Sequence, residues 1–212
     1  MKIIEPSIEI MTETPYEAML RKIERAGRVC YKSEDKIGED TAEQFIRGII
    51  RRGHESVIEH ESISVKVICD RGVTHEIVRH RIASYSQEST RYCNYTDGKF
   101  DGQNSVIDPA TGFKWDLSDP SDRHKWMIWR DAMVYAEMAY RDLIAAGATP
   151  QEARSVLPNS LKTEIVMTMD LREWRHFIRL RGSKAAHPQI RQITDMIRAL
   201  FVSNYPVFFE DL

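Results

Sequence analysis

The side chains best suited to chemistry gather in residues 75–92, which read HEIVRHRIASYSQESTRY. Arg79, Arg81 and Arg91 bring three guanidiniums to a segment rich in hydroxyl groups. Arginine offers planar, bidentate donors and serine adds short ones, a combination that suits phosphate or another anion. A solvated basic helix end followed by a surface loop gives the same pattern, so the spacing alone leaves both interpretations open.

A second polar group lies further along the chain, at Arg154, Asp170–Arg172, His176 and Arg181. On a helix beginning at residue 171, Arg172 and His176 lie one turn apart. Further basic residues on the same stretch are Arg175, Arg179 and Lys184. One interpretation of such a basic face is an anion-binding site. The other is a solvated face whose charges are balanced by carboxylates such as Glu173.

Several well-defined catalytic motifs are absent. Neither His54-Glu55 nor His75-Glu76 is followed by a second histidine at the H-E-x-x-H spacing, so no metal site is predicted. No G-x-G-x-x-G or G-x-x-x-x-G-K-[ST] occurs, and any nucleotide must be held without a Rossmann or P-loop arrangement. The three cysteines form no C-x-x-C pair, which favours reduced thiols.

Charge and hydropathy exclude other classes of protein. Lys and Arg total 30 and Asp and Glu total 32 in 212 residues, so the net charge of -2 argues against a polyanion binder. No apolar run approaches the roughly 20 residues of a membrane span. The N-terminal stretch carries Glu5 and Glu9 where a signal peptide is apolar, which favours a cytoplasmic protein.

Strands and helices must hold these groups in place. Residues 2–10 are strand-like, residues 61–69 alternate in polarity like a half-buried strand, and residues 161–169 also favour a strand. Helices are predicted at 15–29, 41–52, 72–81, 121–146, 171–181 and, as the last element, 188–204. Residues 82–118 are expected to be irregular, with at most one strand.

Strands and helices in this order do not alternate regularly, which disfavours a doubly wound fold. The order instead favours a single α+β domain over residues 1–212. Its helices pack on a mostly antiparallel or mixed sheet, and it has no Rossmann unit.

Four separate motifs resemble one family. Arg79-His80-Arg81, seven further residues and Ser89 match the R-H-R-x7-S signature of the flavin-dependent thymidylate synthases. Residues 53–60 are similar to that family's G-H-E-[ST]-x-x-E-H segment. Residues 152–158 resemble its E-x-A-R-x-x-L-P segment, and Asp170–Arg172 with Leu180-Arg181 stand where it has N-x-R and L-R.

The resemblance implies an α+β homotetramer whose active sites are shared between subunits. It implies tightly bound FAD and the methylation of dUMP to dTMP, with methylenetetrahydrofolate as carbon donor and NADPH as hydride source. No stable nucleic-acid partner and no membrane are implied. A nucleotide- or RNA-binding module, or a flavin reductase with another acceptor, remain alternatives.

The same resemblance assigns residues to the two ligands. The implied FAD contacts are Ser56, Arg79, His80, Arg81, Gln87, Asp170, Leu171, Arg172 and His176. The implied dUMP contacts are Glu76, Ile77, Val78, Arg79, Gln87, Glu88, Ser89, Thr90, Arg91, Arg154 and Arg181. Arg181 is the expected catalytic residue, because a guanidinium beside the uracil imide stabilises its deprotonated form.

The chain also departs from the family pattern. Gln87 stands where some relatives carry Glu, and Asp170 and His176 stand where some carry Asn. Cys30 lies near a position often occupied by a small hydroxyl residue. These side chains differ in charge and in hydrogen-bond donors, so contacts with the flavin are expected to differ there.

Overall fold

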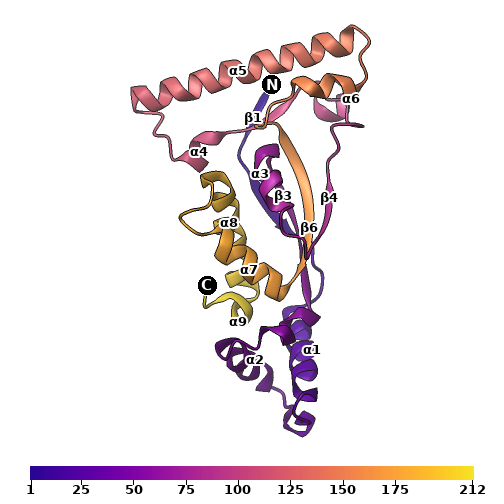
Figure 1. Ribbon diagram of the computed structural model, residues 1–212, viewed down its shortest axis with the longest axis vertical. Coiled ribbons are helices and arrows are strands. Elements are labelled where there is room, and N and C mark those ends of the chain that lie inside the picture. The colour runs from indigo at the N-terminus through magenta and orange to yellow at the C-terminus, as the bar shows by residue number, and fades with distance from the viewer.

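The computed structural model covers residues 1–212 and places a β-sheet between two helical ends of an elongated molecule (Figure 1). The strands are β1 (Lys2–Ile4), β2 (Ser7–Ile10), β3 (Ser62–Asp70), β4 (Ser84–Gln87), β5 (Ser105–Ile107) and β6 (Lys162–Asp170). The α-helices are α1 (Tyr16–Val29), α2 (Thr41–Arg51), α3 (Arg71–Ile77), α4 (Pro109–Phe113), α5 (Pro120–Ala145), α6 (Pro150–Ala153), α7 (Leu171–Arg181), α8 (Pro188–Asn204) and α9 (Pro206–Phe209). Helices α1 and α2 lie at one end, and α5 crosses the other.

The main sheet has four strands in the order β2-β3-β6-β4, and all neighbours are antiparallel. A separate parallel pair joins β1 to β5. This arrangement confirms the predicted α+β class with a mixed set of strands. None of the helices, including the 26-residue α5, combines the length and apolar character of a membrane span.

The centre of the sheet is the pairing of β3 with β6. The two strands pair along their whole length, from Ser62 opposite Asp170 to Asp70 opposite Lys162. Alternate side chains, among them Val65 and Met167, are fully buried under helices α3, α7 and α8. The other face is polar and partly open.

Each of these two strands ends in an aspartate that caps the next helix. The Asp70 carboxylate accepts the Val73 N–H at 2.7 Å, and the Asp170 carboxylate accepts the Glu173 N–H at 2.8 Å. Because β3 and β6 are antiparallel, α3 and α7 start from opposite ends of the strand pair and run toward each other. Their last turns meet, and this meeting point holds the candidate site.

The Asp170 cap can be tested by substitution. Burial raises the pKa of the Asp170 carboxyl, and the nearby Glu59 and Glu173 carboxylates add to this. Relative to the unfolded chain, the folded state therefore disfavours the charged form of this carboxyl. We expect Asp170→Asn, which keeps the acceptor, to be at least as stable as the wild type in urea unfolding. Asp170→Ala should lose about 1 kcal/mol; equal stability of all three proteins would contradict the capping role.

One predicted helix is shorter than expected. The prediction over 72–81 is wrong beyond Ile77, where α3 ends, so Glu76 and His80 do not share a helix face. The Tyr85 hydroxyl lies 2.9 Å from the carbonyl oxygen of Ile77 and 2.7 Å from that of His80. These contacts satisfy carbonyls at the helix end and let the chain turn into β4.

The strand-like character predicted for residues 2–10 is confirmed, but as two strands. Pro6, which has no N–H to donate, separates β1 from β2, and the two strands join different partners. Residues 82–118 hold β4, β5 and α4 rather than at most one strand. The short helix α9 was also not predicted, since 188–204 was expected to be the last element.

Candidate functional site

Arg181, the last residue of α7, is held at three points where α7 meets the end of α3. Its Nη1 lies 2.9 Å from a carboxylate oxygen of Glu76, and its Nη2 lies 2.9 Å from the Glu76 carbonyl oxygen. Its Nε lies 3.1 Å from His80 Nε2. A guanidinium has five N–H groups, so one on each terminal nitrogen remains for a ligand.

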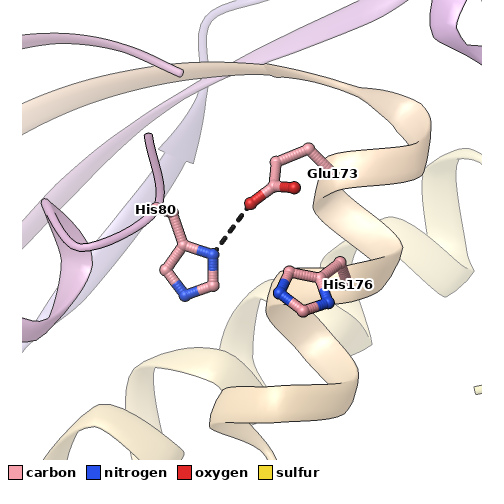
Figure 2. A group of neighbouring side chains, drawn as sticks. All are labelled: His80, Glu173 and His176. Carbon is pink, nitrogen blue, oxygen red and sulfur yellow. Dashed lines mark hydrogen bonds and ion pairs between the residues drawn. The ribbon is translucent and has the colours of Figure 1, made fainter. Parts of the chain in front are cut away.

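His80 is buried between Arg181 and Glu173. The Glu173 carboxylate lies 2.9 Å from His80 Nδ1, as the dashed line in Figure 2 shows. Burial lowers the pKa of His80, and the positive charge of Arg181 adds to this against the opposing effect of Glu173. The imidazole is therefore neutral at pH 7 and joins the two charged side chains through both ring nitrogens.

His176, one turn after Glu173 on α7, lies beside this pair (Figure 2). His80, Glu173 and His176 each offer one atom of a kind that binds metal ions, and these three atoms lie within 4.8 Å of one another. Two imidazoles and a carboxylate are zinc ligands. Both ring nitrogens of His80 already have partners, however, and the adjacent Arg181 repels a second cation. We therefore interpret the group as a hydrogen-bond network.

A cavity of about 550 Å³ opens beside the network. Asp170, Arg172 and His176, three of the predicted flavin contacts, line it. The other lining residues are Glu55, Glu59, Ile82, Glu173 and Arg179. Glu55, Glu59, Asp170 and Glu173 bring carboxylates to the cavity wall. Arg172 is already paired with Glu59 at 2.5 Å, so hydrogen-bond acceptors predominate there.

The remaining predicted flavin contacts differ in exposure. Arg79, Arg81 and Ser56 are exposed, and the side chains of both arginines have no hydrogen bond or ion pair within the chain. Leu171 is fully buried and can reach a ligand only through its main chain. The amide of Gln87 points into the fold and donates to the hydroxyls of Thr74 and Thr163 at 3.1 and 3.2 Å.

The predicted dUMP contacts fall into two groups. Glu76, Ile77 and Val78 lie at the end of α3 near Arg181, with Ile77 fully buried and Val78 exposed. Residues 87–91 continue from β4 toward α6, where Arg91 Nε donates to the Gln151 side chain at 3.2 Å. No hydrogen bond joins this second group to Arg181.

The loop at 88–91 is partly held by internal contacts. The Glu88 carboxylate accepts from Lys162 and from the Tyr95 hydroxyl, both at 2.8 Å, and these groups border a cavity of about 580 Å³. Thr90 is buried, and the Ser89 hydroxyl accepts the Arg91 N–H at 3.3 Å. Arg154 is exposed and has no partner within the chain.

Two important residues were not found by the sequence reasoning. Glu173 was considered only as a counter-charge on a solvated face, yet it binds His80. Arg175 is predicted only to add charge to this helix face, yet it is fully buried and paired with Glu55 and Asp211. For Glu173, the i, i+3 spacing from His176 was the one sequence signal, because it places Glu173 beside a predicted site residue on the same helix face.

Comparisons with known proteins agree with this arrangement. Residues 12–207 match the family described as thymidylate synthase complementing protein. A Mycobacterium protein (strain JLS) named flavin-dependent thymidylate synthase is 34% identical, covering 96% of this chain and 84% of its own length. A Geobacter sulfurreducens protein of the same name is 33% identical, covering 88% of this chain and 78% of its own.

A third relative differs more in length. The Pyrococcus furiosus protein of the same name is 34% identical over 163 residues, which are 76% of this chain and 63% of that protein. The chain thus spans less than two thirds of that relative. The family match nevertheless extends over nearly all of the sequence and includes both helix ends that form the site. The chain belongs to the flavin-dependent thymidylate synthase family.

Proposed function

We propose that the protein methylates dUMP to dTMP, with methylenetetrahydrofolate as the carbon donor and NADPH as the reductant of tightly bound FAD. The observation that carries the proposal is the fixed guanidinium of Arg181. Glu76 and His80 hold it, and two of its N–H groups remain free. Such a cation beside the uracil imide stabilises negative charge on the ring and makes a ring carbon nucleophilic.

The residues of the chain suit a flavin dinucleotide. The exposed guanidiniums of Arg79 and Arg81 lack partners within the chain. They suit a pyrophosphate in a protein that has no glycine-rich loop to bind one. The carboxylates around the 550 Å³ cavity accept hydrogen bonds from hydroxyl and N–H groups of such a ligand. When bound, the flavin supplies hydride transfer between the nicotinamide and the one-carbon group.

The separation of the two predicted dUMP groups supports sites shared between subunits of a homotetramer. Arg91 and Arg154 are exposed near α6 and do not contact the Arg181 network. We infer that a ligand using both groups takes one of them from another copy of the chain. We therefore propose a cytoplasmic tetramer with no stable nucleic-acid partner, in which dUMP phosphate binds Ser89 and Arg91.

A reconstitution assay tests the proposal. Purified protein should bind FAD and turn yellow, and NADPH should bleach the colour. dTMP should form only when FAD, NADPH, dUMP and methylenetetrahydrofolate are all present, and omission of any one should stop the reaction. A protein that takes up no FAD contradicts the proposal. Bleaching without dTMP, and with equal rates for other nucleotides, would instead indicate a flavin reductase with another acceptor.

A further inference from the structure

A line of hydrogen bonds runs from Glu173 through His80 to Arg181. Glu173 lies 2.9 Å from His80 Nδ1, and Arg181 Nε lies 3.1 Å from His80 Nε2 (Figure 2 shows the first contact). Glu173 is in the first turn of α7, and Arg181 is its last residue. The imidazole of His80 therefore bridges two charged side chains from opposite ends of the helix.

The donors on this line determine where the imidazole proton lies. The Nε of arginine always carries a hydrogen and cannot accept one. His80 Nε2 must therefore be the acceptor, and the single proton of the neutral ring lies on Nδ1. The Glu173 carboxylate is the acceptor for that proton, and Nδ1 has no other hydrogen-bond partner within the chain.

We propose that Glu173 is a positioning residue for Arg181. By accepting the Nδ1 proton it holds His80 in one tautomer, and that tautomer lets Nε2 hold the guanidinium of Arg181 in place. This inference deepens the proposed function, on which its kinetic and dUMP-affinity tests rest, whereas the test of the His80 tautomer does not.

The consequence of losing the acceptor follows from burial. His80 is 4% exposed, so an Nδ1 proton without a partner is unfavourable. The proton then moves to Nε2, where its N–H faces the N–H of Arg181 Nε. Two donors repel each other, and Arg181 turns away from the position that the other contacts with Glu76 define.

Two variants separate the acceptor from the charge. Glu173→Gln and Glu173→Met both remove the negative charge at the start of α7, with side chains of similar length. Only glutamine keeps an oxygen that accepts from Nδ1. Glu43→Met, which removes a carboxylate from an exposed ion pair on α2, is the matched control.

The first measurement uses flavin-free protein labelled with ¹⁵N-histidine. Two-bond proton–nitrogen spectra report which ring nitrogen carries the proton. The wild type, Glu173→Gln and Glu43→Met should show His80 protonated at Nδ1, and Glu173→Met should show it at Nε2. A wild-type ring protonated at Nε2, or an unchanged ring in Glu173→Met, overturns the proposal.

The second measurement is kinetic. We expect kcat for dTMP formation to fall about 100-fold in Glu173→Met, because a misplaced catalytic group has an effect of this size. In Glu173→Gln the decrease should be a few-fold. Equal decreases in both variants would assign the effect to charge and overturn the proposal.

A double-variant cycle tests whether Glu173 acts through Arg181. Glu173→Met should weaken dUMP affinity in the wild-type background and have no further effect in Arg181→Ala. Independent, additive effects overturn the proposal. If the spectra follow the expected pattern but the wild type itself forms no dTMP, the proposed function fails and the positioning of Arg181 stands.

Discussion

Arg181→Ala is expected to abolish detectable dTMP formation while the fold survives. Removing one preorganised donor from a developing charge lowers kcat about 10²- to 10³-fold in well-studied enzymes, and Arg181 offers two such donors together with a full positive charge. The measurement is the initial rate of dTMP formation with all four components present. Wild-type turnover in the variant would remove Arg181 from the reaction.

Arg181→Lys makes the same test more specific. A lysine ammonium keeps the charge but has no planar fork, so it cannot bind Glu76 and His80 and still direct two donors at a ligand. We expect this variant to remain severely impaired. Arg51→Ala, which removes an exposed arginine from α2, is the control and should keep wild-type activity. Full rescue by lysine would show that charge alone suffices.

The stability of Arg181→Ala needs a separate measurement. The substitution leaves Glu76 unpaired, but its side chain is 31% exposed and can be hydrated. We therefore expect only a modest loss of unfolding free energy. A large loss would attribute the inactivity to unfolding rather than to the missing guanidinium.

Arg175→Ala is expected to destabilise the fold by about 2–5 kcal/mol, because truncating a fully buried side chain leaves a cavity and removes the donor to the Phe208 carbonyl. Arg175 is fully buried and binds Glu55 at 3.1 Å and Asp211 at 2.6 and 2.7 Å. It also donates to the Phe208 carbonyl. The loss is a large fraction of the stability of an ordinary domain, and urea unfolding measures it.

Two variants serve as controls for this prediction. Arg179→Ala removes an exposed arginine that binds the same Glu55 and should lose at most about 1 kcal/mol. Arg175→Met fills the volume with apolar atoms and should lose less than Arg175→Ala. Equal losses of unfolding free energy in Arg175→Ala and Arg179→Ala would show that the burial of Arg175 adds nothing to the stability of the fold.

The same cluster makes stability depend on pH. Burial raises the pKa of Glu55, but hydrogen bonds from Arg179 and Arg175 outweigh it and the net pKa is lowered. The hydrogen bond from Arg175 lowers the pKa of Asp211. A lowered carboxyl pKa contributes stability above the unfolded value of about 4, and this stability is lost as the pH falls below it. In Arg175→Ala the acid-induced loss should be smaller.

Local patterns predicted most of the elements that carry the site. The alternation of residues 61–69 and the spacing of 171–181 depend only on neighbours in the chain, so β3 and α7 were predicted within a residue or two. The motif resemblance assigned Arg79–Arg81 and Arg181 to one site; the structure joins His80 of this group to Arg181, and the roles of Arg79 and Arg81 stay a prediction. Strand alternation, helix spacing and motifs each depend on residues close together in the chain, so the sequence alone indicates them.

The features that were missed depend on distant residues. The end of α3 is set by Tyr85 from the next strand, and the burial of Arg175 depends on Asp211 near the C-terminus. A charged residue on a helix gives no sign of which element will cover it. For the same reason, no spacing rule indicated that Glu173 would meet His80, a residue 93 positions away in the chain.

The strand order has a consequence for how the chain folds. Strand β6 is the last to be synthesised, yet it lies in the interior of the sheet, between β3 and β4. Until residues 162–170 leave the ribosome, β3 has one unpaired edge and β4 has no partner, and such edges are templates for association with other chains. Pairing across such a sequence separation is slow. The nascent chain therefore cannot bring the ends of α3 and α7 together before residues 162–181 are available, and chaperone protection should be needed most in that interval.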